Sequence, residues 1–130
     1  QKSIEGIRHD SVGVHIQLAA SVIFQTGSAN LEEEGLATLE KVARMLKSSK
    51  RRLIVEGHTD DQTIQSTRFA SNWELGAMRA TKIVRYLISR GVDPALLTAV
   101  TYADQKPLVE NSSEENRAKN RRIEILITQE

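Results

Sequence analysis

The stretch Leu53–Asp61 reads LIVEGHTDD, a change from apolar to polar residues within a few positions. Leu53–Val55 is a run of branched apolar residues, which is typical of a short buried strand. The polar residues that follow predict a loop, and a loop directly after a buried strand is a common position for a binding site. An amphipathic segment of helical length lies on each side, so this stretch predicts an α/β fold.

Each flanking helix is predicted from apolar residues spaced three and four positions apart. The upstream helix spans residues 30–46 and begins with a capping-box pair, Asn30 and Glu33. The downstream helix spans residues 71–90, begins with a similar pair and ends before Gly91. Both helices need a sheet against which to bury their apolar stripes.

The remaining strands are predicted near the two ends of the chain and after the second helix. Residues 4–18 contain spaced apolar side chains and break near Asp10, which indicates two short strands. Residues 98–103 and 122–128 are interpreted as further strands. The order strands, helix, strand, helix, strand, strand predicts an α/β two-layer sandwich with helices on one face of a mixed sheet.

The composition limits the kinds of partner. The 130 residues have the length of one domain, and 18 Lys and Arg against 17 Asp and Glu leave a net charge of +1. This balance favours neither nucleic acid nor anionic lipid. The chain has no cysteine, and no stretch approaches the roughly 18 apolar residues of a membrane span. It begins at Gln1 rather than methionine, so we expect it to be part of a longer protein.

His58 is the histidine best placed for metal or acid–base chemistry, because Asp60 and Asp61 lie beside it. The chain lacks the second, suitably spaced ligands of a recognisable metal site, so we predict no metal and no cofactor. It also lacks the Gly-x-Ser-x-Gly turn of serine hydrolases and the glycine-rich loop that binds phosphates.

The segment Arg117–Arg122 has four cations in six positions and could form a nucleic-acid patch, a solvated charged face or part of a local anion site. Acidic residues flank the segment and no aromatic side chain interrupts it, which argues against nucleic acid. The solvated face and the anion site remain as interpretations.

The second helix carries the most informative face. Asn72, Gly76 and Arg79 lie at positions i, i+4 and i+7, so they share one side of its first two turns. A glycine inside a helix costs about 1 kcal/mol relative to alanine. Two explanations are open: a side chain at Gly76 would obstruct a ligand between Asn72 and Arg79, or the glycine packs closely against a loop.

A pair of opposite charges is expected near this face. If the loop that contains Thr59 and Asp60 folds over the helix, a carboxylate and the Arg79 guanidinium converge on a small cleft. The two groups could form a salt bridge. Separated by the width of a ligand, they would suit a zwitterion such as an amino-acid head group, because the carboxylate accepts from an ammonium and the guanidinium binds a carboxylate.

Three ordered motifs give the chain a family resemblance. They are Glu56-Gly-His-Thr-Asp60, Asn72-x-x-Leu75-x-x-x-Arg79-Ala80, and Arg117-Ala-x-Asn-Arg-Arg-Ile-Glu124. Together they resemble the OmpA-like peptidoglycan-binding domain family, over about residues 24–128. Within that family, residues 57–61, Phe69 and Ser71–Leu75 look like the periplasmic part of flagellar-motor stator B subunits of the MotB/PomB type.

The resemblance implies a βαβαββ-type sandwich that holds the diaminopimelate residue of the peptidoglycan stem peptide. It implies that Asp60 binds the free ammonium group of diaminopimelate and that Arg79 binds its carboxylate. The other implied site residues are Thr59, Asn72 and Leu75, which line the groove, and Arg121 and Arg117 on its anion-binding side. Two positions depart from the family pattern: Gly76 stands where serine is common, and Thr101–Tyr102 where a Gly–Tyr pair is usual.

The resemblance also implies the setting of the domain. Residues 1–22 are expected to be strands or a linker before the core, and residues 23–130 the OmpA-like domain. It implies a non-catalytic homodimer in the bacterial periplasm that anchors a motor stator to the cell wall. It also implies an N-terminal part, missing from this chain, that carries a single inner-membrane helix and contacts a stator A subunit. The alternatives are the wall-binding domain of an outer-membrane lipoprotein or porin tail, a module that binds a partner's carboxyl terminus, or a cell-wall hydrolase with His58 and Asp60 as its acid–base pair.

Overall fold

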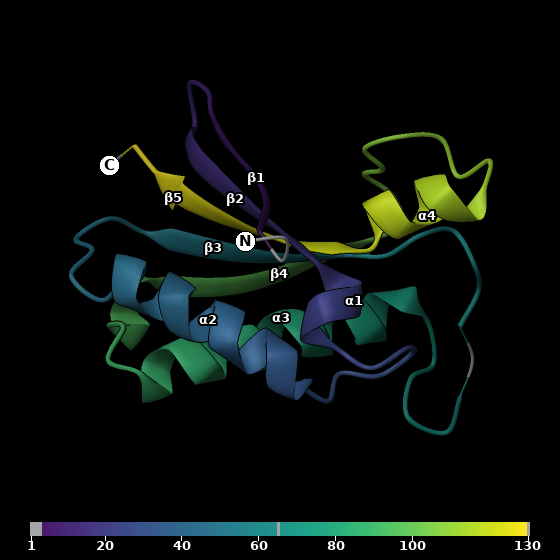
Figure 1. Cartoon of the computed structure of the whole chain (residues 1–130), viewed down its shortest axis with the longest axis horizontal. Helices are drawn as coiled ribbons and strands as arrows, with labels where there is room; N and C mark the ends of the chain where they lie inside the picture. Colours follow the sequence, from purple (N-terminus) through teal and green to yellow (C-terminus); the bar gives the residue numbers. More distant parts are fainter. Residues whose placement is uncertain (1–3, 65, 130) are drawn as a thin grey trace.

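The structure is a computed structural model that describes residues 4–64 and 66–129. Its elements, in chain order and as labelled in Figure 1, are strands β1 (Ile4–His9) and β2 (Gly13–Ala19), helices α1 (Ala20–Ile23) and α2 (Glu33–Leu46), strand β3 (Leu53–His58), helix α3 (Asn72–Ser89), the short 3-10 helix η1 (Pro94–Leu96), strand β4 (Leu97–Ala103), helix α4 (Glu114–Asn120) and strand β5 (Arg122–Thr128).

The strands of the described residues form one mixed sheet in the order β1-β2-β5-β3-β4. β3 and β4 are parallel, because α3 connects them as a crossover, and the other neighbouring strands are antiparallel. Figure 1 shows α2 and α3 side by side along one face of the sheet. The predicted α/β sandwich, with helices on one face of a mixed sheet, is therefore confirmed.

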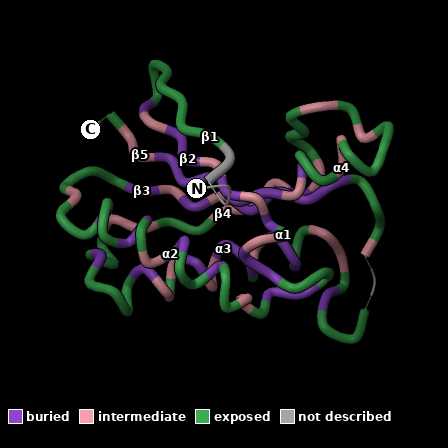
Figure 2. The backbone as a smooth tube through the Cα atoms, viewed as in Figure 1, coloured by how far each residue is buried: buried purple, intermediate pink, exposed green. Residues whose placement is uncertain are grey.

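The hydrophobic core lies between this face and the two long helices (Figure 2). Both helices and the strands β2, β3 and β5 contribute buried side chains to it, among them Leu39, Ile83, Leu18, Val55 and Ile125. β2 is an inner strand of the sheet, with β1 on one side and β5 on the other. Residues 13–19 thus share the core of the later elements, and the domain boundary at residue 22 remains a prediction.

The α2 helix begins at Glu33, three residues later than predicted. Its N-cap is Glu32, and Asn30 caps nothing. Instead, the Asn30 carbonyl accepts a hydrogen bond from the Gln25 amide (3.2 Å), and the Asn30 amide donates to Ser28 Oγ (2.9 Å). These two hydrogen bonds place Asn30 in the loop before α2, so the helix does not begin at the predicted capping residue.

The α3 helix begins at the predicted cap and ends within one residue of the predicted end. Ser71 Oγ accepts from the Trp73 amide (3.1 Å) and donates to the Glu74 carboxylate. Gly91 has a φ of +101°, a left-handed conformation that lets the chain leave the helix without strain. The N-terminal turns of α3, which carry Asn72 and Arg79, are therefore well fixed.

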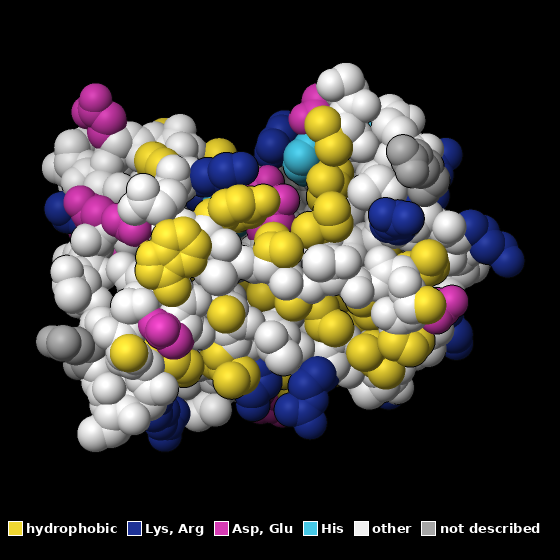
Figure 3. Space-filling view, turned by 180° about the vertical axis from the view of Figure 1, so that it is seen from behind, with side chains coloured by type: hydrophobic (Ala, Val, Ile, Leu, Met, Phe, Trp, Pro, Cys, Tyr) yellow, Lys and Arg dark blue, Asp and Glu magenta, His cyan; other side chains and the backbone are white. Residues whose placement is uncertain are grey.

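The opposite face of the sheet carries a network of polar side chains. Arg122 Nε donates to Glu124 Oε2 (2.7 Å), and both side chains are buried. His58 shares a hydrogen bond with Glu56 (3.0 Å) and stacks on Tyr102. Seen from behind, acidic, basic and histidine side chains meet at a hollow in the molecular surface (Figure 3). The buried charges of Arg122 and Glu124 on this face thus form an ion pair, which offsets the cost of their burial.

Candidate ligand-binding site

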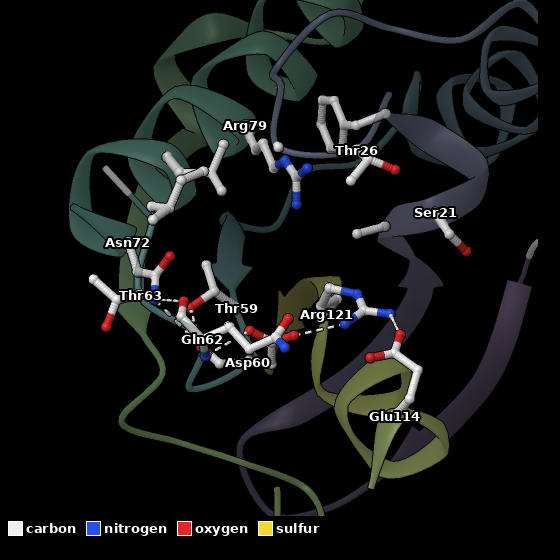
Figure 4. Close-up of a pocket in the computed structure, with 15 residues that line it drawn as sticks. Ser21, Thr26, Thr59, Asp60, Gln62, Thr63, Asn72, Arg79, Glu114 and Arg121 are labelled. Atoms are coloured by element: carbon white, nitrogen blue, oxygen red, sulfur yellow. Dashed lines mark hydrogen bonds and ion pairs between the residues drawn. The ribbon is translucent and has the colours of Figure 1, made fainter. Parts of the chain in front are cut away.

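A cavity of about 370 Å³ opens between α1 with its following loop, the loop after β3, the first turns of α3, and α4. Six of the seven residues predicted for the site line this cavity: Thr59, Asp60, Asn72, Leu75, Arg79 and Arg121 (Figure 4). The chain segments that carry them are far apart in sequence, so the fold itself brings the predicted site together.

Asp60 presents a buried carboxylate in the loop after β3, with only 5% of the residue exposed. Oδ1 accepts from the Gln62 amide (2.9 Å), which turns the loop back on itself. Oδ2 accepts from Arg121 Nη1 (2.6 Å), and Arg121 also pairs with Glu114. The amide of the preceding residue, Thr59, donates to the Ala103 carbonyl (2.9 Å) and fixes the loop to the end of β4.

Arg79 presents a buried guanidinium from α3, with 6% of the residue exposed. Its Nε donates to the Ser28 carbonyl (2.8 Å) and its Nη2 to the Gln25 carbonyl (3.3 Å), and the group lies over the Phe24 ring. Figure 4 shows the guanidinium pointing into the cavity. Within the described part of the chain Arg79 has no carboxylate in ion-pair contact, unlike Arg121.

The electrostatic state of Arg79 follows from this environment. Burial lowers the pKa of the guanidinium, the positive charge of Arg121 also lowers it, and Asp60 opposes both effects; the net pKa is about 10. Arg79 therefore stays charged at neutral pH, although its charge is poorly solvated. Its contacts in the described residues are two backbone carbonyls and the Phe24 ring, so an anion that enters the cavity would stabilise the buried charge.

The other predicted lining residues shape the wall. Asn72 Nδ2 donates to the Gln62 carbonyl (2.9 Å), so the start of α3 holds the loop after β3. Thr59 Oγ1 donates to the Asp60 carbonyl (2.9 Å). Leu75 is buried in a small apolar cluster with Phe69 and contributes the apolar part of the wall.

Three residues singled out in the sequence lie elsewhere. Arg117 does not line the cavity and pairs instead with Asp61 (3.1 Å). Gly76 does not line it either: a Cβ on Gly76 would lie 2.3 Å from Thr101 Oγ1 on β4. The explanation by ligand access was therefore wrong, and close packing, against the sheet rather than a loop, accounts for the glycine. His58 lies outside the cavity, so it forms no acid–base pair with Asp60 there.

The far wall of the cavity, which was not predicted from the sequence, includes Ser21, Thr26 and Glu114. Ser21 lies on α1, a helix too short to show a periodic pattern. Thr26 belongs to a polar run that indicated only a loop. Glu114 faces the cavity because of its ion pair with Arg121, which only the folded chain reveals.

Within residues 4–64 and 66–129, the His, Asp and Glu side chains form no group of three or more that could hold a metal ion. No helix in this part of the chain has the length and apolarity needed to cross a membrane.

The fold and the cavity together define a small α/β ligand-binding domain. The chain belongs to the OmpA family, whose model matches residues 23–121. This is a non-catalytic family of peptidoglycan-binding domains, as the three sequence motifs predicted.

The relatives of the chain include motility and wall-associated proteins. It is 34% identical over 119 residues to motility protein B of Bacillus subtilis, covering 90% of this chain and 46% of that protein. It is 36% identical over 102 residues to the peptidoglycan-associated lipoprotein of Pseudomonas aeruginosa, covering 78% and 58%. The solved periplasmic domain of Helicobacter pylori MotB has a TM-score of 0.87 at 33% identity, covering 95% of this chain and 82% of that one. The chain spans about half the length of the curated relatives it matches.

Proposed function

We propose that the cavity binds the diaminopimelate residue of the peptidoglycan stem peptide, and that the domain thereby anchors a flagellar-motor stator to the cell wall. The observation that carries the binding proposal is Arg79, a buried cation that has no carboxylate partner among the described residues and that shares one cavity with the buried carboxylate of Asp60. A free amino acid end, with an ammonium and a carboxylate, complements both groups.

The strength of binding follows from these two contacts. Each charge-assisted hydrogen bond contributes about 1.5–3 kcal/mol, so the head group contributes about 3–6 kcal/mol. One site then has a dissociation constant between about 6 mM and about 40 μM. Firm attachment to a wall requires several domains acting together, which agrees with the homodimer expected from the sequence. Arg121 takes part indirectly, because its ion pair orients the Asp60 carboxylate.

The stator assignment rests on the relatives named motility protein B and on the MotB periplasmic domain. It places the domain in the periplasm, in a protein that a single N-terminal helix anchors in the inner membrane beside a stator A subunit. A second candidate is the wall-binding part of an outer-membrane lipoprotein, favoured by the 36% identity to the peptidoglycan-associated lipoprotein. Replacing the wall-binding domain of a stator B subunit by this chain distinguishes them: restored swarming supports the stator, and lost swarming with normal wall binding supports the lipoprotein.

The binding proposal is tested with purified sacculi. Asp60→Asn and Arg79→Lys keep the size of each side chain closely enough for the fold to persist, and circular dichroism verifies this. Both variants should lose co-sedimentation with diaminopimelate-containing sacculi. Arg90→Lys is the matched control, because Arg90 pairs with Glu40 at the other end of α3 (2.9 Å) and should bind normally. Retained pelleting of both cavity variants would refute the site.

The ligand is tested with walls of different chemistry. Sacculi that carry lysine in place of diaminopimelate keep the side-chain ammonium but lack the carboxylate that Arg79 would bind. Such walls should pellet much less protein than diaminopimelate walls. Equal pelleting by the two walls would contradict the role given to Arg79.

A further inference from the structure

A second cavity, of about 260 Å³, lies beside the first. The two cavities share Thr63, Ile64 and Asn72 in their linings, so they adjoin across the loop after β3. The second cavity is also lined by Trp73 from the first turn of α3. Its indole is an exposed large apolar side chain, with 49% of the residue accessible. It therefore offers a flat apolar surface to a ligand.

Two carboxylates complete the chemistry of this second cavity. Asp61 and Asp104 both line it. Asp61 uses Oδ1 for its contact with Arg117, and Asp104 uses Oδ1 to accept from Gln105. In the described residues these contacts engage only one oxygen of each carboxylate, so Oδ2 of each is available to a hydroxyl donor. The cavity thus combines an aromatic surface with hydrogen-bond acceptors.

We propose that the second cavity binds a sugar ring of the peptidoglycan glycan strand, with one face of the pyranose on Trp73 and its hydroxyl groups donating to Asp61 and Asp104. A pyranose carries C–H groups on its faces and O–H groups on its rim, which matches this arrangement of groups. The inference rests on the proposed function, because the sugar belongs to the same muropeptide whose diaminopimelate occupies the first cavity. The dipeptide between them spans about 7 Å or more when extended, enough to reach an adjoining cavity.

Trp73 also makes the inference directly measurable, because it is the only tryptophan of the chain. Three ligands are titrated while its fluorescence is recorded: free diaminopimelate, a sugar-free stem tripeptide that ends in diaminopimelate, and the same tripeptide on its disaccharide. Calorimetry gives the affinities. The disaccharide tripeptide should bind about three- to tenfold more tightly than the sugar-free tripeptide, which corresponds to about 0.6–1.4 kcal/mol. It alone should change the Trp73 emission strongly.

The variants separate the two cavities. Trp73→Ala should remove the advantage of the disaccharide while leaving the affinity for the sugar-free tripeptide unchanged. Trp73→Phe should keep part of that advantage. Met78→Ala is the matched control, since Met78 is an exposed apolar residue of α3 that lines neither cavity, and it should behave as the wild type.

The possible failures are distinguishable. Equal affinity for the tripeptide with and without sugar would overturn the sugar site and leave the diaminopimelate site standing. An equal emission change with the sugar-free tripeptide would show that peptide occupies the second cavity and would also overturn it. Trp73 emission that changes with protein concentration and not with ligand would show that Trp73 contacts another copy of the chain, and would overturn the sugar site. If none of the three ligands binds, the proposed function itself fails.

Discussion

Gly76 and Thr101 make a contact whose energetics can be worked out from the structure. An added Cβ on Gly76 would lie 2.3 Å from Thr101 Oγ1 and 3.3 Å from the Gly57 carbonyl. Gly76→Ala therefore forces Thr101 to rotate and to give up the hydrogen bond from the Ala103 amide (3.2 Å). Overpacking costs about 1–3 kcal/mol, and alanine in place of a helical glycine returns about 1 kcal/mol. We expect the free energy of unfolding to fall by about 0–2 kcal/mol.

A double-mutant cycle with Thr101→Ala tests this explanation. Without the hydroxyl, the severe overlap is gone and only the 3.3 Å approach to the Gly57 carbonyl opposes the helical preference of alanine. Gly76→Ala should then raise the free energy of unfolding by about 0.5–1 kcal/mol. The interaction free energy between the two sites is then about 0.5–3 kcal/mol. Urea unfolding followed by circular dichroism measures all four proteins.

A control and a refuting result complete the test. Gly6→Ala adds a Cβ that meets nothing within 4 Å, and it should change stability by less than about 0.5 kcal/mol. An interaction free energy below about 0.5 kcal/mol would refute the reasoning, because independent sites give values of that size. On this reasoning the two departures from the family pattern, at Gly76 and Thr101, are one compensated exchange.

Other parts of the structure give further expectations. Asn120 is fully buried and bonds to the Leu108 and Val109 backbones, so Asn120→Ala should cost about 2–4 kcal/mol in urea unfolding; a loss below about 1 kcal/mol would contradict this. Ser71→Ala removes the α3 cap and should cost about 1 kcal/mol, measured by thermal unfolding. Burial raises the pKa of Glu124, but its hydrogen bond and ion pair with Arg122 hold that pKa below its ordinary value. Its contribution to stability is therefore complete above about pH 4.5 and is lost as the pH falls through the lowered value. Glu124→Gln should lose less stability than the wild type between about pH 5 and pH 3, whereas an equal acid slope in the two proteins would rule this out.

The long elements could be predicted because their signals are local. The apolar spacing of α2 and α3 and the Ser71 cap depend on neighbouring residues, and so does the run of branched residues in β3. The start of α2 could not be predicted, because asparagine is a residue type that favours the N-cap position, whereas Asn30 forms hydrogen bonds within the preceding loop. Its carbonyl accepts a hydrogen bond from the Gln25 amide, a contact that depends on how the loop after α1 folds.

The candidate site also combines features that local sequence predicts with features that depend on contacts between distant residues. The convergence of Asp60 and Arg79 on one cavity follows from a loop after a strand and one face of a helix, both visible in the sequence. The pairing of Arg121 with Asp60 joins residues 61 positions apart, and no local pattern encodes it. Gly76 shows the limit most clearly: two explanations were open from the sequence, and only the position of Thr101 on β4 separates them.

The first cavity has a mechanical consequence, because its walls come from segments between Ala20 and Arg121, which span most of the chain. Arg79 is held by carbonyls of the loop after α1, and Asp60 by the side chain of Arg121, which directly precedes β5. Between these contacts and the chain ends lie β2 and β5, two inner strands that pair with each other. Tension on either end would therefore have to separate inner strands of the sheet before it could dismantle the cavity. If the proposed function holds, the domain would keep its ligand under load for as long as β2 and β5 stay paired.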